Sequence, residues 1–215
     1  MKFNYVIIFA VTFICSGLTV LKAQTVKDID GNIYKTVTIG KQVWMAENLK
    51  TTKYNDGKVI PTGNDAWYRT DAICFYDNSF INKRDYGALY NWDAVLSGKL
   101  CPIGWHVSTD VEWTTLTTFL GGENVAGGKL KEIGTTHWLS PNVGATNESG
   151  FTALPSGSLN RGEFNNMMYY GYFWTATSAS DLTAWFRSIS KYDGQVVRAT
   201  YTKSVGFAVR CLKDK

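Results

Sequence analysis

The sequence predicts one α+β domain that follows an export signal. Strand patterns open and close the region after residue 23, and two or three helical patterns lie between them. The 215 residues are 45% hydrophobic and 19% charged, a composition that supports a packed core and excludes a disordered chain. No internal repeat or low-complexity linker divides residues 24–215. We therefore expect a single domain, with residues 24–65 as a strand and hairpin region packed on it.

Residues 1–23 have the plan of a secretory signal peptide. A lysine precedes a short apolar run that ends at Cys15, and the segment closes with the small residue Ala23. The alternatives are an uncleaved membrane anchor, for which the dense apolar run is short, and a lipid on Cys15, where Ile14 replaces the usual small residue. We expect cleavage, no membrane span afterwards, and an extracytoplasmic protein that is secreted, held at the cell surface or periplasmic.

The charge balance is weakly basic. The net charge is +4, and removal of Lys2 and Lys22 with the signal leaves +2. Lysine and arginine form no cluster that would follow a phosphate backbone, so we expect no nucleic-acid partner.

The first elements of the domain are a turn and a hairpin. Residues 28–32 (Asp-Ile-Asp-Gly-Asn) superficially resemble a calcium loop, but the glycine and the later glutamate miss the required positions, so a turn is favoured. Two β-prone runs, residues 33–39 and 42–49, flank Gly40-Lys41 and predict a hairpin.

Helical patterning follows in two places. In residues 85–96, three apolar side chains recur on one helical face, and Gly98 supplies a stop. Thr109 and Glu112 have the spacing of a capping box, and the apolar positions after them continue a helix to Gly121. A third, weaker helical pattern covers residues 125–133.

After Phe151 the pattern changes to short strands. Four runs rich in aromatic and β-branched residues predict one antiparallel sheet: residues 172–177, 184–190, 195–201 and 206–212.

Three cysteines remain after the signal, so one disulfide and one free thiol are expected in an oxidising compartment. Three pairings are open. We favour Cys101–Cys211, which would close a loop of about a hundred residues and stabilise the fold by up to about 4–5 kcal/mol. Cys74 lies in an apolar string and is expected to be a buried, inert thiol.

The sequence offers no catalytic or metal-binding pattern. Of the two histidines, we expect His106 to bond to backbone near the helix start and His137 to lie in a surface loop. No nucleophile elbow, zinc-ligand spacing or Cys-x-x-Cys pair is present. We predict no catalytic residue, no metal and no cofactor.

Aromatic residues are abundant, at 14% of the chain, and they are the feature of the composition that bears on function. Several lie in polar stretches, where an exposed ring offers a large contact area at low entropic cost to a sugar or protein ligand. The candidate ligand-binding residues are Trp67, Tyr68, Trp138, Tyr169 and Tyr170.

A family resemblance rests on six motifs. They are Tyr-Gly-Ala-Leu-Tyr-Asn-Trp (residues 86–92), Cys-Pro-Ile-Gly-Trp-His-Val-Ser-Thr-Asp-Val-Glu-Trp (101–113), Gly-Gly-Lys-Leu-Lys (127–131), Gly-Phe-Thr-Ala-Leu-Pro (150–155), Phe-Trp-Thr-Ala-Thr (173–177) and Gly-Phe-Ala-Val-Arg-Cys (206–211). Together they closely resemble the Fibrobacter succinogenes major paralogous domain, from about residue 37 to the C-terminus. The resemblance implies a secreted or surface protein of Bacteroidota-like or Fibrobacter-like bacteria with no established biochemical activity.

More distantly, the same order of motifs is similar to the C-type lectin-like fold, which formylglycine-generating and sulfatase-modifying domains share. That resemblance also supports the Cys101–Cys211 pairing. The loop at residues 140–142 (Ser-Pro-Asn) lacks the carboxylate of calcium-dependent lectins, and three thiols with one disulfide cannot supply the cysteine pair of formylglycine-generating enzymes. Neither activity is therefore carried over with the fold.

We expect an exported, non-enzymatic binding or adhesion module whose ligand is a glycan or a cell-surface protein. The alternatives are a polysaccharide-acting hydrolase or lyase and a passive surface scaffold. The sequence does not predict an oligomeric state.

Overall fold

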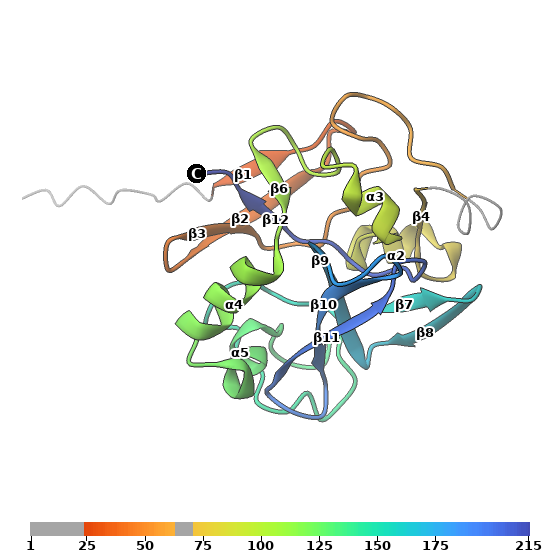
Figure 1. Cartoon of the computed structure of the whole chain (residues 1–215). Coiled ribbons are helices and arrows are strands. Elements are labelled where there is room, and N and C mark those ends of the chain that lie inside the picture. The colour runs from red at the N-terminus through yellow and green to blue at the C-terminus, as the bar shows by residue number, and fades with distance from the viewer. Residues whose placement is uncertain (1–23, 63–70) are drawn as a thin grey trace, which may run out of the picture.

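The computed structural model describes residues 24–62 and 71–215 (Figure 1). The expected signal peptide, residues 1–23, and the candidates Trp67 and Tyr68 lie outside the described residues. The described chain forms one small domain that is mostly β-sheet with a few helices.

The first sheet joins the two ends of the domain. Its strand order is β1 (Thr25–Lys27), β2 (Ile33–Ile39), β3 (Gln42–Met45), β12 (Cys211–Lys213) and β6 (Trp105–Val107), and neighbouring strands pair antiparallel. The predicted hairpin is confirmed: β2 pairs with β3 across Gly40, whose φ of 61° suits a tight turn. Asp28 makes a turn before β2 and accepts hydrogen bonds from Asn32 and Tyr34, as the turn prediction requires.

The second sheet has the order β11 (Val196–Thr202), β10 (Thr183–Ser190), β9 (Tyr170–Ser178), β7 (Ser156–Asn160) and β8 (Glu163–Met167). Three predicted strands are confirmed here as β9, β10 and β11. The fourth predicted strand, residues 206–212, was assigned to the wrong sheet, because it ends in β12, which belongs to the first sheet. Residues 206–208 cross between the sheets through single bridges to Leu159, Tyr90 and Phe173, and regular pairing resumes only at Cys211.

The predicted helix over residues 85–96 is also wrong. The chain there forms α2 (Phe80–Tyr86), strand β5 (Leu89–Tyr90), which pairs with β4 (Ile73–Cys74), and α3 (Trp92–Leu96); a short 3-10 turn, η1 (Tyr76–Asn78), precedes α2. Gly87 ends α2 with a φ of 81°, and a Cβ there would lie 2.6 Å from the Cβ of Asn48. The close approach of the residue 48–49 segment therefore breaks the helix.

Helix α4 (Asp110–Phe119) begins with the predicted capping box of Thr109 and Glu112. Helix α5 (Glu123–Leu130) confirms the weaker helical prediction over residues 125–133, with bounds two to three residues nearer the N-terminus. Its two glycines are required by close backbone contact: a Cβ on Gly127 would lie 2.1 Å from the Gln195 carbonyl oxygen, and one on Gly128 2.3 Å from that of Gly144.

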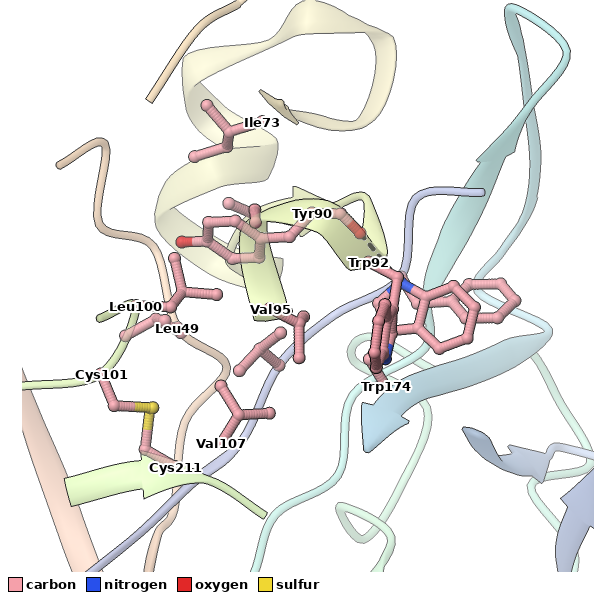
Figure 2. Packing of buried hydrophobic residues seen from close by; sticks show 14 of the residues in the cluster. Leu49, Ile73, Tyr90, Trp92, Val95, Leu100, Cys101, Val107, Trp174 and Cys211 are labelled. Carbon is pink, nitrogen blue, oxygen red and sulfur yellow. Dashed lines mark hydrogen bonds between the residues drawn. A yellow bond between two sulfur atoms is a disulfide. The ribbon is translucent and has the colours of Figure 1, made fainter. Parts of the chain in front are cut away.

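The core has two main clusters. One surrounds Trp44, Trp113, Phe151 and Phe173 between α4, α5 and the sheets. The other, shown in Figure 2, gathers Tyr90, Val107 and Trp174 beside the disulfide.

The predicted disulfide joins Cys101 to Cys211, with Cα atoms 6.0 Å apart, and so ties the segment before β6 to β12 (Figure 2). Cys74 is a free, buried thiol, and burial raises its pKa, as expected of an inert cysteine.

Among the fully buried cations, Arg210 and Lys131 connect loops by donating to backbone carbonyl oxygens. Arg210 donates to Asn48 Oδ1 and to three backbone carbonyl oxygens, of Met45, Phe151 and Thr152. The ammonium of Lys131 donates to the carbonyl oxygens of Val143, Ser190 and Asp193 at 2.7–2.9 Å. These contacts hold the long segment between α5 and β7 against both sheets.

Candidate functional site

The candidate site lies on the face of the second sheet that α4 and α5 do not cover. Side chains alternate along β9, so Tyr170, Tyr172 and Trp174 share one face, while Phe173 points to the other. Phe173 packs in the core cluster with Trp113 of α4. The Tyr170–Tyr172 face is therefore turned away from α4 and α5.

A hairpin forms a wall along this face. Strands β7 and β8 pair with Asn160 opposite Glu163, and Arg161 and Gly162 make the two-residue turn with φ of 53° and 82°. Positive φ at both positions matches the turn that closes tight hairpins. In Figure 1 the β7–β8 hairpin projects at the side of β9, β10 and β11.

Between the hairpin and the sheet lies a hollow of about 360 Å³, which we call the aromatic trough. Its floor is aromatic and its wall is polar. The lining residues are Tyr172, Phe186, Tyr201, Val205 and Phe207 on the sheet side and Ser158, Asn160, Arg161, Glu163, Asn165 and Asn166 on the hairpin side.

The aromatic floor is one contiguous set of rings. Tyr172 stacks on Phe207 with centroids 5.0 Å apart, and Phe186 lies 5.0 Å from Phe207 and 6.1 Å from Tyr201. Phe186 and Phe207 are buried, whereas Tyr201 is 41% exposed. Tyr201 therefore presents its ring to the hollow, whereas the Tyr172 ring is stacked by both Phe207 and Tyr170.

Asparagines of the hairpin orient both tyrosine hydroxyls. The Asn166 side-chain amide donates to the Tyr172 hydroxyl at 3.1 Å, and that of Asn160 donates to the Tyr201 hydroxyl at 3.2 Å. Each hydroxyl oxygen thus accepts a bond and keeps its proton for donation, while each amide keeps its carbonyl oxygen as an acceptor. Burial raises the pKa of Tyr172 to about 12, so the hydroxyl stays protonated near neutral pH.

Two sequence-predicted residues adjoin the trough. Tyr170 stacks on Tyr172 at 5.5 Å between centroids, and Tyr192 lies 6.1 Å from Tyr170 and 6.5 Å from Tyr169. Tyr169 is 38% exposed and Tyr192 is 52% exposed. We call Tyr169, Tyr170 and Tyr192 the tyrosine strip; it continues the aromatic floor beyond the hollow.

Trp138 was predicted to be an exposed ligand-binding residue, and that prediction is wrong. It is fully buried, its indole N–H donates to the Ala153 carbonyl oxygen at 3.0 Å, and the Lys131 ammonium lies 5.6 Å from its ring centre. Its polar sequence neighbours suggested exposure, but the loop folds the ring into the core. Burial removes Trp138 from the candidate binding residues.

Sequence reasoning missed most of the trough. Tyr172, two residues from Tyr170 in a β-prone run, could have been assigned to the same face by alternation. Asn160 and the turn after it could have been read as a hairpin tip. Tyr201 and Phe207 reach the trough only through the strand order, which no local pattern specifies.

Apart from the aromatic trough, a cluster of charged groups lies around His106 at the surface beside α4. Its Nδ1 lies 2.6 Å from a carboxylate oxygen of Asp214 and its Nε2 lies 3.0 Å from one of Glu112. The prediction that His106 bonds to backbone was therefore wrong, because both of its partners are carboxylates. The pairing of β6 with β12 brings Asp214, which follows β12, close to His106.

The carboxylates change the titration of this cluster. The hydrogen bond with Glu112, opposed by burial and helped by Asp214, raises the pKa of His106 to about 9. Burial raises the pKa of Glu112, but hydrogen bonds from His106 and Thr109 outweigh it and lower that pKa to about 2. Because Glu112 also closes the capping box of α4, we assign the cluster a structural role. His137, in a loop as predicted, bonds to Glu132 at 2.8 Å.

Within the described ranges, no group of three histidine, cysteine, aspartate or glutamate side chains could hold a metal ion. Across the same residues, no helix is long and apolar enough to cross a membrane.

Comparisons with known proteins give one family. Residues 37–213 match the model of the Fibrobacter succinogenes major domain. No curated protein and no solved structure matches the chain. The matched segment covers most of the sequence, including the second sheet, the disulfide and the first sheet from residue 37 onward. The chain belongs to the Fibrobacter succinogenes major domain family.

Proposed function

We propose that this domain is an exported, non-enzymatic binding or adhesion module and that the aromatic trough binds a glycan. The observation that carries the proposal is the pairing of an aromatic floor with an amide-bearing wall in one hollow. A sugar ring has apolar C–H faces that pack on aromatic rings and hydroxyls that need both donors and acceptors. The trough offers both kinds of contact.

The polar groups suit hydroxyl recognition. Tyr172 and Tyr201 keep a hydroxyl proton to donate, and the side-chain oxygens of Asn160 and Asn166 remain as acceptors. Because the hairpin already holds these groups in place, little side-chain entropy is lost when a ligand binds.

Binding is favoured over cleavage by the composition of the lining. Among the described lining residues, Glu163 is the one carboxylic acid. Glycoside hydrolysis normally uses two carboxyl groups on opposite sides of the scissile bond. A polysaccharide-acting hydrolase or lyase remains the alternative, as do a cell-surface protein ligand and a passive scaffold.

We also propose export and a C-type lectin-like fold. The Cys101–Cys211 disulfide supports an extracytoplasmic, secreted or surface location, because such bonds persist in oxidising compartments. The capped helix α4 after β6 and the bridge from that region to the last strand support the lectin-like assignment.

The test is a binding assay with residues 24–215 expressed in an oxidising compartment. Soluble and insoluble polysaccharides are presented with calcium and with a chelator, and retention is measured for the parent, Tyr201→Ala and Phe119→Ala. Phe119 is an exposed aromatic residue on α4, away from the trough, and serves as the matched control.

We expect saturable binding that Tyr201→Ala abolishes, that Phe119→Ala preserves and that the chelator does not change. Absence of binding across the panel, or equal loss in both variants, would overturn the proposal. Cleavage products in the supernatant would favour the hydrolase or lyase alternative.

A further inference from the structure

We infer, building on the proposed glycan-binding function, that the ligand is a neutral oligosaccharide chain of several sugar units and that it extends beyond both ends of the aromatic trough. The trough alone would hold a short ligand. Three features of the surrounding surface point to a longer one: an adjoining hollow, the tyrosine strip and the balance of charge.

The first feature is a second hollow at the hairpin tip. It has a volume of about 410 Å³ and is lined by Asn160, Arg161, Tyr201, Thr202 and Ser204. Three of these residues also line the trough, so the two hollows adjoin where the Asn160 amide bonds to the Tyr201 hydroxyl. Tyr201 stands between them, where one ring can contact a chain that passes from one hollow into the other.

The second feature is the tyrosine strip at the opposite end. Tyr172 belongs to the trough, Tyr170 stacks on it with ring planes inclined by 11°, and Tyr192 follows. The Lys191 ammonium lies 4.8–5.0 Å from the ring centres of Tyr169 and Tyr192 and donates to the Ser140 carbonyl oxygen. This contact supports two partly exposed rings, which are suited to stack further sugar units.

The third feature is the balance of charge. Among the described residues that line the two hollows, Arg161 and Glu163 are the charged ones, and they carry opposite signs. Amides, hydroxyls and aromatic rings make up the rest, apart from Val205. An anionic chain would meet Glu163 and a cationic one Arg161, so a neutral chain fits these two hollows best.

The experiment titrates residues 24–215 by calorimetry with neutral β-1,4-linked gluco-, xylo- and manno-oligosaccharides of one to six units. Oligogalacturonates of the same lengths serve as the anionic series. The proteins are the parent, Tyr192→Ala in the strip, Tyr201→Ala between the hollows and Phe119→Ala as control. Circular dichroism and thermal unfolding establish that each variant is folded.

We expect the affinity for at least one neutral series to rise tenfold or more from two to six units, and to exceed that of the anionic series. Tyr192→Ala is expected to weaken hexasaccharide binding about tenfold and leave the disaccharide unchanged, whereas Tyr201→Ala weakens both. Phe119→Ala changes neither.

Affinity that does not depend on chain length, together with wild-type behaviour of Tyr192→Ala, would overturn the extended-chain inference and leave the glycan site itself intact. Stronger binding of the anionic series would overturn the neutral-ligand assignment. Absence of binding by every oligosaccharide would overturn this inference and the proposed function together.

Discussion

Raising the pH is expected to destabilise the domain through one contact, the bridge of His106 to Glu112 and Asp214. The folded state raises the pKa of this histidine from 6.5 to about 9. A group whose pKa rises on folding stabilises the fold fully below its unfolded pKa, and this stabilisation is lost as the pH rises through the folded value. The contribution of His106 is therefore complete below pH 6.5 and lost through about pH 9.

The size of the effect follows from the shift. A shift from 6.5 to about 9 corresponds to about 3 kcal/mol, since each pH unit is worth about 1.4 kcal/mol. The histidine side chain is 36% exposed and the Asp214 side chain 52% exposed, so solvent screening reduces the contribution to about 1–2 kcal/mol. Glu112 has the opposite sign: its lowered pKa stabilises the fold above pH 4.5, and that contribution is lost as the pH falls through about 2.

The assay is urea unfolding of the parent and of His106→Gln at pH 6 and pH 10. Other groups titrate in this range, including Lys131, whose pKa burial lowers to about 8, so the quantity of interest is the difference between the two proteins. We expect the parent to be more stable by about 1–2 kcal/mol at pH 6, with the advantage largely lost at pH 10. An equal difference at both pH values would refute the reasoning.

Three further predictions concern the core, the disulfide and export. Arg210→Met leaves Asn48 Oδ1 and three carbonyl oxygens without their donor. We expect the free energy of unfolding in urea to fall by about 4 kcal/mol or more. A fall below about 1 kcal/mol would contradict the role assigned to this buried cation. The double variant Cys101→Ser/Cys211→Ser removes a bridge between residues 110 positions apart, and its free energy of unfolding is expected to fall by about 4–5 kcal/mol. Cys74→Ser serves as a control outside the bridge. Equal unfolding midpoints for the double variant and the parent would contradict this prediction. Export of the full chain is expected to yield a protein that begins at Gln24, which intact mass spectrometry checks, and retention of residues 1–23 would contradict the cleavage prediction.

Local sequence signals predicted much of the fold. The hairpin around Gly40, the cap of α4 and strands β9 to β11 each depend on residues close together in the chain. Such signals operate through turn geometry, capping bonds and alternation, which need few distant partners. The Cys101–Cys211 disulfide was favoured from the positions of the cysteines, and the family resemblance supported the same pairing.

The failures have distant causes. The helix expected over residues 85–96 breaks because the chain near Asn48 lies against Gly87. The last strand leaves the second sheet because residues 206–208 pass between the sheets. Trp138 is buried by a loop that the Lys131 ammonium holds in place through hydrogen bonds to the carbonyl oxygens of Val143 and Ser190. Local sequence patterns do not predict such long-range contacts.

The candidate site was predicted only at its margin. Tyr169 and Tyr170 were identified as aromatic residues in a polar stretch, and they adjoin the trough through Tyr172. The trough itself draws on β7, β8, β9, β10 and β11, and the parallel pairing of β7 with β9 sets the hairpin beside the sheet. Strand order therefore creates the site, and the local patterns of a single sequence do not specify strand order.

The central claim, that the aromatic trough is a glycan site, is tested most directly by the retention of residues 24–215 on a polysaccharide panel beside Tyr201→Ala and Phe119→Ala. The account predicts saturable retention of the parent and of Phe119→Ala and loss of retention for Tyr201→Ala. Retention that survives Tyr201→Ala, or no retention of the parent on any polysaccharide, would contradict it.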